Sequence, residues 1–118
     1  MSADEGLIAW VADGLSPVGI VTWRGMMGGA TLYLDGTVFA IVGDDGLWFK
    51  SDAQADRAWD AAGCERFTYA RRDGRVASMN YRRAPDDTLD DVDALRHWAS
   101  IAIAAGRRAP VKRRRPAG

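Results

Sequence analysis

The side chains of this sequence that most readily do covalent chemistry are its one histidine, His97, and its one cysteine, Cys64. His97 stands beside Trp98 in a predicted helix, and the only acid one helical turn away is Asp93. A catalytic base must reach its nucleophile within hydrogen-bond distance, and a histidine in the middle of a helix beside Trp98 is instead expected to be a core-edge or solvated side chain. A reactive thiol needs a neighbouring cation or histidine, and the only cation close to Cys64 in the chain is Arg66. We therefore expect Cys64 to be a small, partly buried apolar residue. We therefore expect a protein that is not an enzyme.

Metal and cofactor sites are equally poorly supported by the residue types. One Cys and one His cannot build a Cys/His zinc site, and a lone cysteine, which cannot form an internal disulfide, is typical of a reducing compartment. Asp44 and Asp45 form an acidic pair between Gly43 and Gly46, which indicates either a solvated turn or a weak cation site. We expect no bound metal and no cofactor.

Three glycines, Gly25, Gly28 and Gly29, come directly before a strand-like segment. A phosphate-binding Walker loop needs Lys and Ser/Thr after its last glycine and a helix that begins there, whereas Gly29 is followed by Ala-Thr-Leu-Tyr-Leu. A dinucleotide-binding turn fails for the same reason. We predict that these glycines supply unusual backbone angles or a close approach at a strand bend, and that Met26 and Met27 fill gaps there.

Composition indicates one compact domain in the cytoplasm. The chain has 118 residues, 47% of them hydrophobic and 27% charged, and it contains no apolar run of about 18 residues that could span a membrane. Its first residues carry acids where a secretory signal would carry basic side chains.

Charge is distributed unevenly along the chain although the formal net charge is zero. Residues 1–106 hold ten cations and sixteen acids, whereas residues 107–118 hold six cations and no acid. Two prolines and the lack of apolar periodicity predict that residues 107–118 form a disordered basic tail after a domain of residues 1–106. Its cations are candidate contacts to DNA phosphates: Arg107, Arg108, Lys112, Arg113, Arg114 and Arg115. The alternatives are a tail that folds over the acidic residues 86–93 and a tail that only aids solubility.

Periodicity predicts an α+β domain with helices against one face of a mainly antiparallel sheet of five to six strands. Capping boxes at Ser2 and Ser51 and a start at Thr88 or Asp90 predict three helices, the last of which ends at Gly106. The turns Asp35-Gly36 and Asp73-Gly74 predict hairpins. The expected order is α-β-β-β-β-α-β-β-α, with strands at 18–23, 31–34, 37–42, 47–50, 66–71 and 75–82. Trp10, Trp59 and Trp98 lie on the helices and are expected in the core.

An ordered set of short motifs runs through most of the chain. It comprises RGMMGGATLYLDG at residues 24–36, then Phe39-Ala40, Leu47-Trp48-Phe49-Lys50, Phe67-Thr68-Tyr69, Met79-Asn80-Tyr81 and Pro85. The set resembles the N-terminal domain of the TfoX/Sxy family of bacterial competence regulators, over about residues 7–107. The resemblance implies structural roles for Met26, Gly28, Gly29, Tyr33, Asp35, Gly36, Lys50, Tyr69 and Tyr81.

The resemblance also implies a fold of the secretion-chaperone-like type and a function without catalysis. Relatives raise the transcription of DNA-uptake genes together with the cyclic-AMP receptor protein. This chain departs from the family pattern at Met27, where Phe is usual, and the basic tail stands where full-length regulators have a C-terminal domain. These departures favour a small regulatory or nucleoid-associated module over a competence regulator as such.

Two classes of function therefore follow from the sequence. In the first, the protein is a DNA-associated transcriptional regulator whose domain contacts the transcription machinery or a second copy of itself, while the tail contacts phosphates. In the second, it is a protein-interaction module that uses an exposed sheet face or edge and binds no nucleic acid.

Overall fold

A computed structural model describes residues 4–26 and 28–109 of the chain. It confirms an α+β domain with the predicted order of helices and strands. A short 3-10 helix before the last helix was not predicted. The elements are α1 (Glu5–Gly14), β1 (Val21–Met26), β2 (Gly29–Leu34), β3 (Thr37–Gly43), β4 (Gly46–Lys50), α2 (Asp56–Ala61), β5 (Arg66–Ala70), β6 (Val76–Arg83), η1 (Asp86–Leu89) and α3 (Val92–Arg108).

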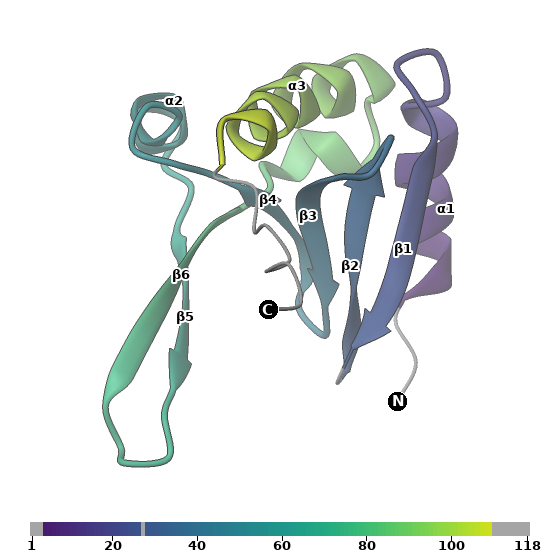
Figure 1. Ribbon diagram of the computed structural model, residues 1–118. Coiled ribbons are helices and arrows are strands. Elements are labelled where there is room, and N and C mark those ends of the chain that lie inside the picture. Colours follow the sequence, from purple (N-terminus) through teal and green to yellow (C-terminus); the bar gives the residue numbers. More distant parts are fainter. Residues whose placement is uncertain (1–3, 27, 110–118) are drawn as a thin grey trace, which may run out of the picture.

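The six strands form one antiparallel sheet in the order β1-β2-β3-β4-β6-β5. Side chains alternate across a strand, so Ala30, Leu32 and Leu34 of β2 are all buried on one face. That face is covered by α1 and α3 (Figure 1). Within the described part of the chain, no helix has both the length and the apolar character needed to cross a membrane.

The three helical tryptophans lie in or against the core, as predicted. Trp59 is completely buried and stacks between Phe49 and Trp98, with ring centroids 5.6 and 5.2 Å away. Trp10 packs at the edge of the core, where its indole N–H donates to the carbonyl oxygen of Thr88 at 2.7 Å. The aromatic rings thus join α2 and α3 to β4, while Trp10 ties α1 to η1.

The predicted helix starts are displaced by a few residues. Asp4 caps α1 by accepting from the Leu7 amide at 3.0 Å, while Ser2 lies outside the described residues. Asp91 caps α3 in place of Thr88 or Asp90, because η1 occupies the residues just before it. At α2, the Asp52 carboxylate accepts from the Ala55 amide, so the predicted capping box at Ser51 is wrong. At α1 and α3 an aspartate, which is an equally good cap, takes the role expected of a neighbouring residue. At α2 the N-cap residue, Ala55, has no side-chain capping bond, and the bond to Asp52 lies in the turn before the helix.

Gly106 does not end the last helix, which continues to Arg108. A Cβ atom at Gly106 would lie 2.2 Å from the carbonyl oxygen of Val38, so this glycine allows α3 to approach the backbone of β3. Arg107 and Arg108, assigned from sequence to a disordered tail, therefore belong to the last turn of α3. The rest of the predicted tail, residues 110–118, lies outside the described residues.

The glycine segment lies at the turn between β1 and β2, where Met26 pairs with Gly29, and not at the predicted strand bend. Its members differ in role. Gly28 has φ +73°, and a Cβ at Gly29 would lie 2.1 Å from the carbonyl oxygen of Val42. Gly25 has neither a positive φ nor a close backbone neighbour, since a Cβ added there would meet no atom within 4 Å. Met26 does not fill a gap: it is 46% exposed, and its sulfur accepts from the Thr31 hydroxyl at 3.1 Å. Met27 lies outside the described residues.

Gly29→Ala is expected to lower the free energy of unfolding by about 1–3 kcal/mol, because β2 and β3 must separate to admit the methyl group. Gly25→Ala is the matched control, and it is expected to change that free energy by less than about 0.5 kcal/mol. Urea denaturation of both variants tests the pair. Equal losses at the two positions would contradict the assignment of the close approach to Gly29.

Candidate functional site

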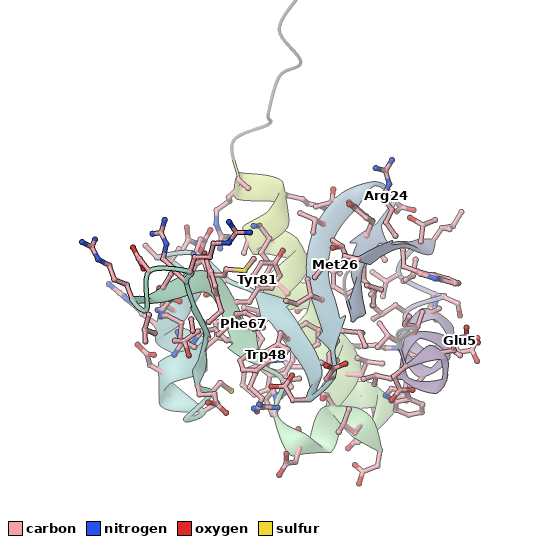
Figure 2. The ribbon with its side chains drawn as sticks, turned by 90° about the horizontal axis from the view of Figure 1, so that it is seen from below. Glu5, Arg24, Met26, Trp48, Phe67 and Tyr81 are labelled. Atoms are coloured by element: carbon pink, nitrogen blue, oxygen red, sulfur yellow. The ribbon has the colours of Figure 1, made fainter. Side chains whose placement is uncertain are left out.

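The face of the sheet that lies away from α1 and α3 carries a small aromatic cluster. Ile41, Trp48 and Tyr81 are buried there, and Phe67 packs against them. The rings of Trp48 and Phe67 meet edge to face with centroids 4.9 Å apart. Figure 2 shows Trp48, Phe67 and Tyr81 grouped on this side, with α3 behind the sheet. We call this surface, defined by these four residues, the aromatic face.

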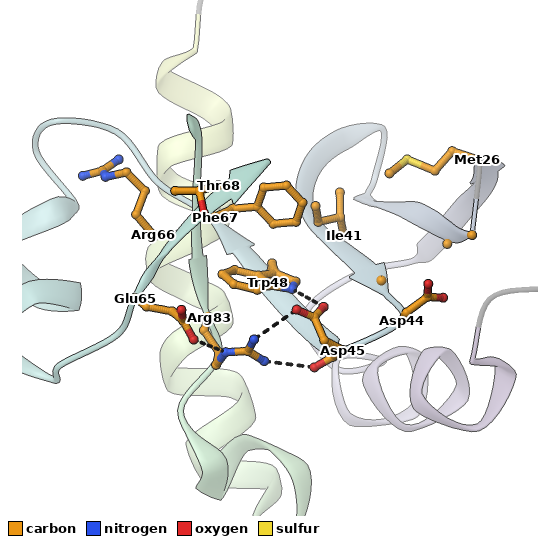
Figure 3. A pocket seen from close by; sticks show the side chains of 13 residues that line it. Met26, Ile41, Asp44, Asp45, Trp48, Glu65, Arg66, Phe67, Thr68 and Arg83 are labelled. Atoms are coloured by element: carbon orange, nitrogen blue, oxygen red, sulfur yellow. Dashed lines mark hydrogen bonds and ion pairs between the residues drawn. The ribbon is translucent and has the colours of Figure 1, made fainter. Parts of the chain in front are cut away.

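A hollow of about 500 Å³ opens at one end of the aromatic face. It lies between the β3–β4 turn and the start of β5, and Figure 3 shows its side chains. Arg83 crosses it: Nε donates to Glu65 at 2.7 Å, Nη1 to the carbonyl oxygen of Asp45 at 2.9 Å, and Nη2 to the Asp45 carboxylate at 3.1 Å. The guanidinium carbon also lies 4.3 Å from the centroid of the Trp48 ring.

Three of the charged side chains in this hollow, Arg83, Asp45 and Glu65, are paired with one another. The Trp48 indole N–H donates to the Asp45 carboxylate at 2.9 Å, and this bond and the Arg83 guanidinium hold the pKa of Asp45 below its ordinary value. Asp45 is thus an ion-pair partner of Arg83, a role that the sequence did not suggest. Among the described residues no group of three His, Cys, Asp or Glu side chains is placed to hold a metal ion. The hollow presents a guanidinium, an indole and a phenyl ring at a surface.

A second cluster surrounds Arg82, which is only 4% exposed. Its guanidinium donates to the Asp56 carboxylate at 2.9 Å, to the Asp60 carboxylate, and to the carbonyl oxygen of Cys64 at 2.9 and 3.1 Å. Asp56 also accepts from Arg66 at 3.1 Å and from the Ser51 hydroxyl at 2.7 Å. The cluster therefore ties the base of the β5–β6 hairpin to α2. Sequence reasoning missed it, because Arg82 lies far along the chain from the carboxylates that it bonds.

The two reactive residues singled out from the sequence occupy ordinary structural positions. Cys64 is buried; its burial raises the pKa of the thiol, and its carbonyl oxygen serves Arg82. His97 is exposed on α3, with its ring centroid 4.7 Å from that of Trp98. A raised thiol pKa leaves less of the thiolate that a nucleophilic cysteine needs.

The family-motif residues gather largely around the sheet. Asp35 and Gly36 form the tight β2–β3 turn with φ +48° and +86°, and the Asp35 carboxylate also accepts from the Ile20 amide at 3.0 Å. The Lys50 ammonium lies 5.4 Å from the centroid of the Tyr81 ring. Burial, and to a smaller extent the neighbouring Tyr33, raises the pKa of Tyr81. Tyr69 is exposed on β5.

Of the six cations predicted to contact DNA, the structure describes two, Arg107 and Arg108. Arg107 is exposed in the last turn of α3. Arg108 donates from Nε and Nη2 to the two oxygens of Asp52 at 2.7 and 2.9 Å. Lys112, Arg113, Arg114 and Arg115 lie outside the described residues.

The fold and the motif positions define a small α+β module of the competence-regulator type. The family model described as the TfoX N-terminal domain matches residues 13–106, a range that contains all six strands, and the chain belongs to this family. The resemblance found in the sequence is thereby confirmed. No curated protein matches the chain.

Proposed function

We propose that the protein is a non-enzymatic regulator of the TfoX type that associates with DNA through the phosphate backbone. The single observation that carries the proposal is the separation of charge, with six cations and no acid in residues 107–118 against an excess of acids in the remainder. Arginine suits this role because its guanidinium donates two hydrogen bonds to one phosphate. Family membership supports a regulatory role.

The ion pair between Arg108 and Asp52 joins the end of α3 to the residues before α2. Because Arg108 is already bonded within the domain, the proposal rests on Arg107 and on the four cations that follow. The four cations beyond it, Lys112 to Arg115, follow without an intervening acid. A segment with this composition contacts phosphates largely without regard to base sequence.

Replacing Lys112, Arg113, Arg114 and Arg115 together with glutamine is expected to weaken binding to duplex DNA. Each neutralised phosphate contributes about −0.9 to the slope of log K against log salt, so the slope is expected to fall in magnitude by about 3–4. Fluorescence anisotropy titrations of the full chain at several salt concentrations measure this slope. Arg24→Gln/Arg57→Gln, at two exposed arginines elsewhere, is the control. An unchanged slope in the fourfold variant would show that the tail makes no phosphate contacts.

The exposed side chains Tyr69 and Met79 beside the aromatic face favour a second candidate, a protein-interaction module in which two copies of the chain associate. Helices α1 and α3 cover only the opposite face of the sheet, and Tyr69 extends the aromatic surface with 44% of its area exposed. Light scattering at known concentrations measures self-association, and Tyr69→Asp is expected to abolish it. The absence of DNA binding together with a dimer sensitive to Tyr69 would favour this candidate over the first.

A further inference from the structure

The β5–β6 hairpin projects beyond the rest of the sheet (Figure 1). Strand β5 pairs only with β6, and β6 meets β4 only through residues 81–83 opposite 48–50. The outer part of the hairpin, residues 68–80, is exposed except for the half-buried Ala77. At about 3.3 Å per residue, the five residues of β6 beyond the β4 pairing extend the ribbon by roughly 17 Å.

The hairpin is the most basic segment of the described chain. Residues 66–83 contain six arginines and one acid, Asp73, although the rest of residues 1–106 is strongly acidic. Arg66, Arg82 and Arg83 at the base are paired with carboxylates. At the tip, Arg71 and Arg72 have no ion-pair partner among residues 4–26 and 28–109, and Arg75 lies 3.7 Å from Asp73 with most of its side chain exposed.

The base of the hairpin is braced by side-chain hydrogen bonds. Arg82 bonds to α2 and to Cys64, as described above, and Arg66 donates to Asn80 at 2.8 Å and to Asp56 at 3.1 Å. These bonds cross between β5, β6 and α2. A preorganised ribbon loses less conformational entropy when it binds than a mobile loop does.

The two faces of the ribbon differ in chemistry. Phe67, Tyr69 and Met79 lie on the side of the aromatic face, since Tyr69 pairs with Ala77 and side chains alternate along each strand. The other face carries Thr68 opposite Ser78, with Asn80 beside them and the exposed Val76 nearer the tip. Hydroxyl, amide and methyl groups are those that contact base edges in the major groove of DNA.

We propose that the β5–β6 hairpin enters the major groove of duplex DNA, with Arg71, Arg72 and Arg75 against the flanking phosphates. A two-stranded β-ribbon fits this groove, which is about 12 Å wide and 8.5 Å deep, and the projecting part is longer than the groove is deep. The face of Thr68 and Ser78 is the one turned to the bases. The inference rests on the proposed association with DNA and adds to it a second contact element, far from the basic tail in sequence.

The test compares Arg71→Gln/Arg72→Gln with Arg24→Gln/Arg57→Gln, which removes the same charge from exposed positions elsewhere. Both are made in the full chain and titrated against a duplex of about 30 base pairs by fluorescence anisotropy. The hairpin variant is expected to reduce the salt slope by about 2 and to raise Kd near 0.1 M salt on the order of 10- to 100-fold. The control is expected to match the wild type. Urea midpoints equal to the wild-type value show that the folds are intact.

Competition experiments test which groove of the DNA the hairpin occupies. Methyl green occupies the major groove, and netropsin occupies the minor groove. Displacement of the protein by methyl green alone supports the inference, and displacement by netropsin alone overturns it. If the hairpin variant binds as the control does while the fourfold tail variant is weakened, the hairpin makes no contact and the proposed function stands. If the wild type binds no duplex at about 50 mM salt, where phosphate contacts are strong, both proposals fail.

Discussion

Arg82→Ala is expected to lower the free energy of unfolding by about 3–5 kcal/mol, because it removes one partner of a buried ion-pair cluster. The Arg82 side chain is 5% exposed and satisfies Asp56, Asp60 and the carbonyl oxygen of Cys64. Without it, that carbonyl oxygen loses both of the hydrogen bonds that Arg82 donates, and the partly buried Asp56 loses a cation. The base of the hairpin also loses its bonds from β6 to α2.

Arg66→Ala is the matched control for this prediction. It removes a second arginine from the same carboxylate of Asp56, but the Arg66 side chain is 38% exposed, so its loss is expected to cost less than about 1 kcal/mol. Urea denaturation at neutral pH compares the two variants. Similar losses would show that burial of Arg82 contributes nothing beyond a surface ion pair.

The effect of Arg82→Ala is also expected to depend on pH. Burial raises the pKa of Asp56, but the hydrogen bonds from Ser51, Arg66 and Arg82 outweigh it, so the pKa lies below its ordinary value. A carboxylate with a lowered pKa stabilises the fold at neutral pH, and this contribution is lost as the pH falls through the folded-state pKa. The difference in stability between wild type and variant is therefore expected to shrink below about pH 4. A difference that grows on acidification would contradict the lowered pKa.

Trp59→Ala is expected to cost about 3–5 kcal/mol, because it leaves a large cavity between the Phe49 and Trp98 rings. In a domain of this size the midpoint of thermal unfolding would fall on the order of 10–20 °C. Differential scanning calorimetry measures the shift. Trp23→Ala, at a tryptophan that is 52% exposed, is the control and is expected to cost less than about 1 kcal/mol.

Trp59→Phe separates the volume of the ring from its N–H group. Within the described part of the chain, the buried indole nitrogen of Trp59 has no hydrogen-bond partner. Phenylalanine keeps most of the stacking area and removes this unsatisfied donor, so the loss is expected to be well below that of Trp59→Ala. A loss as large as that of the alanine variant would indicate that the indole N–H is bonded in solution.

The order and type of the elements could be predicted because their causes are local. Alternating apolar residues in β2, the Asp35-Gly36 turn and the apolar stripe of α3 each depend on residue types that lie close together in the chain. The resemblance to the TfoX family predicted the same order of helices and strands. Its motifs also lie within short segments of the chain. These features do not depend on which strand neighbours which.

Errors arose where a residue has two possible roles that only a distant partner distinguishes. Gly106 has the residue type of a helix end, yet the backbone of β3 makes it a contact glycine inside α3. Met26 has the residue type of a core filler, yet β1 is an edge strand and leaves it exposed. No pattern within the helix or the strand carries this information.

By itself, the sequence determined the α+β class, the tight turns, the packing of the helical tryptophans in or against the core and the excess of cations after residue 106, since each follows from residue types and near-neighbour spacing. Only the tertiary structure decided that β6 pairs with β4, because strand pairing depends on surfaces that meet after the chain has folded. That pairing buries Arg82 among carboxylates, places Arg83 over Trp48 and leaves the basic tip of the hairpin outside the sheet. The charges that matter most were visible in the sequence, but which of them are neutralised is a question of three-dimensional proximity.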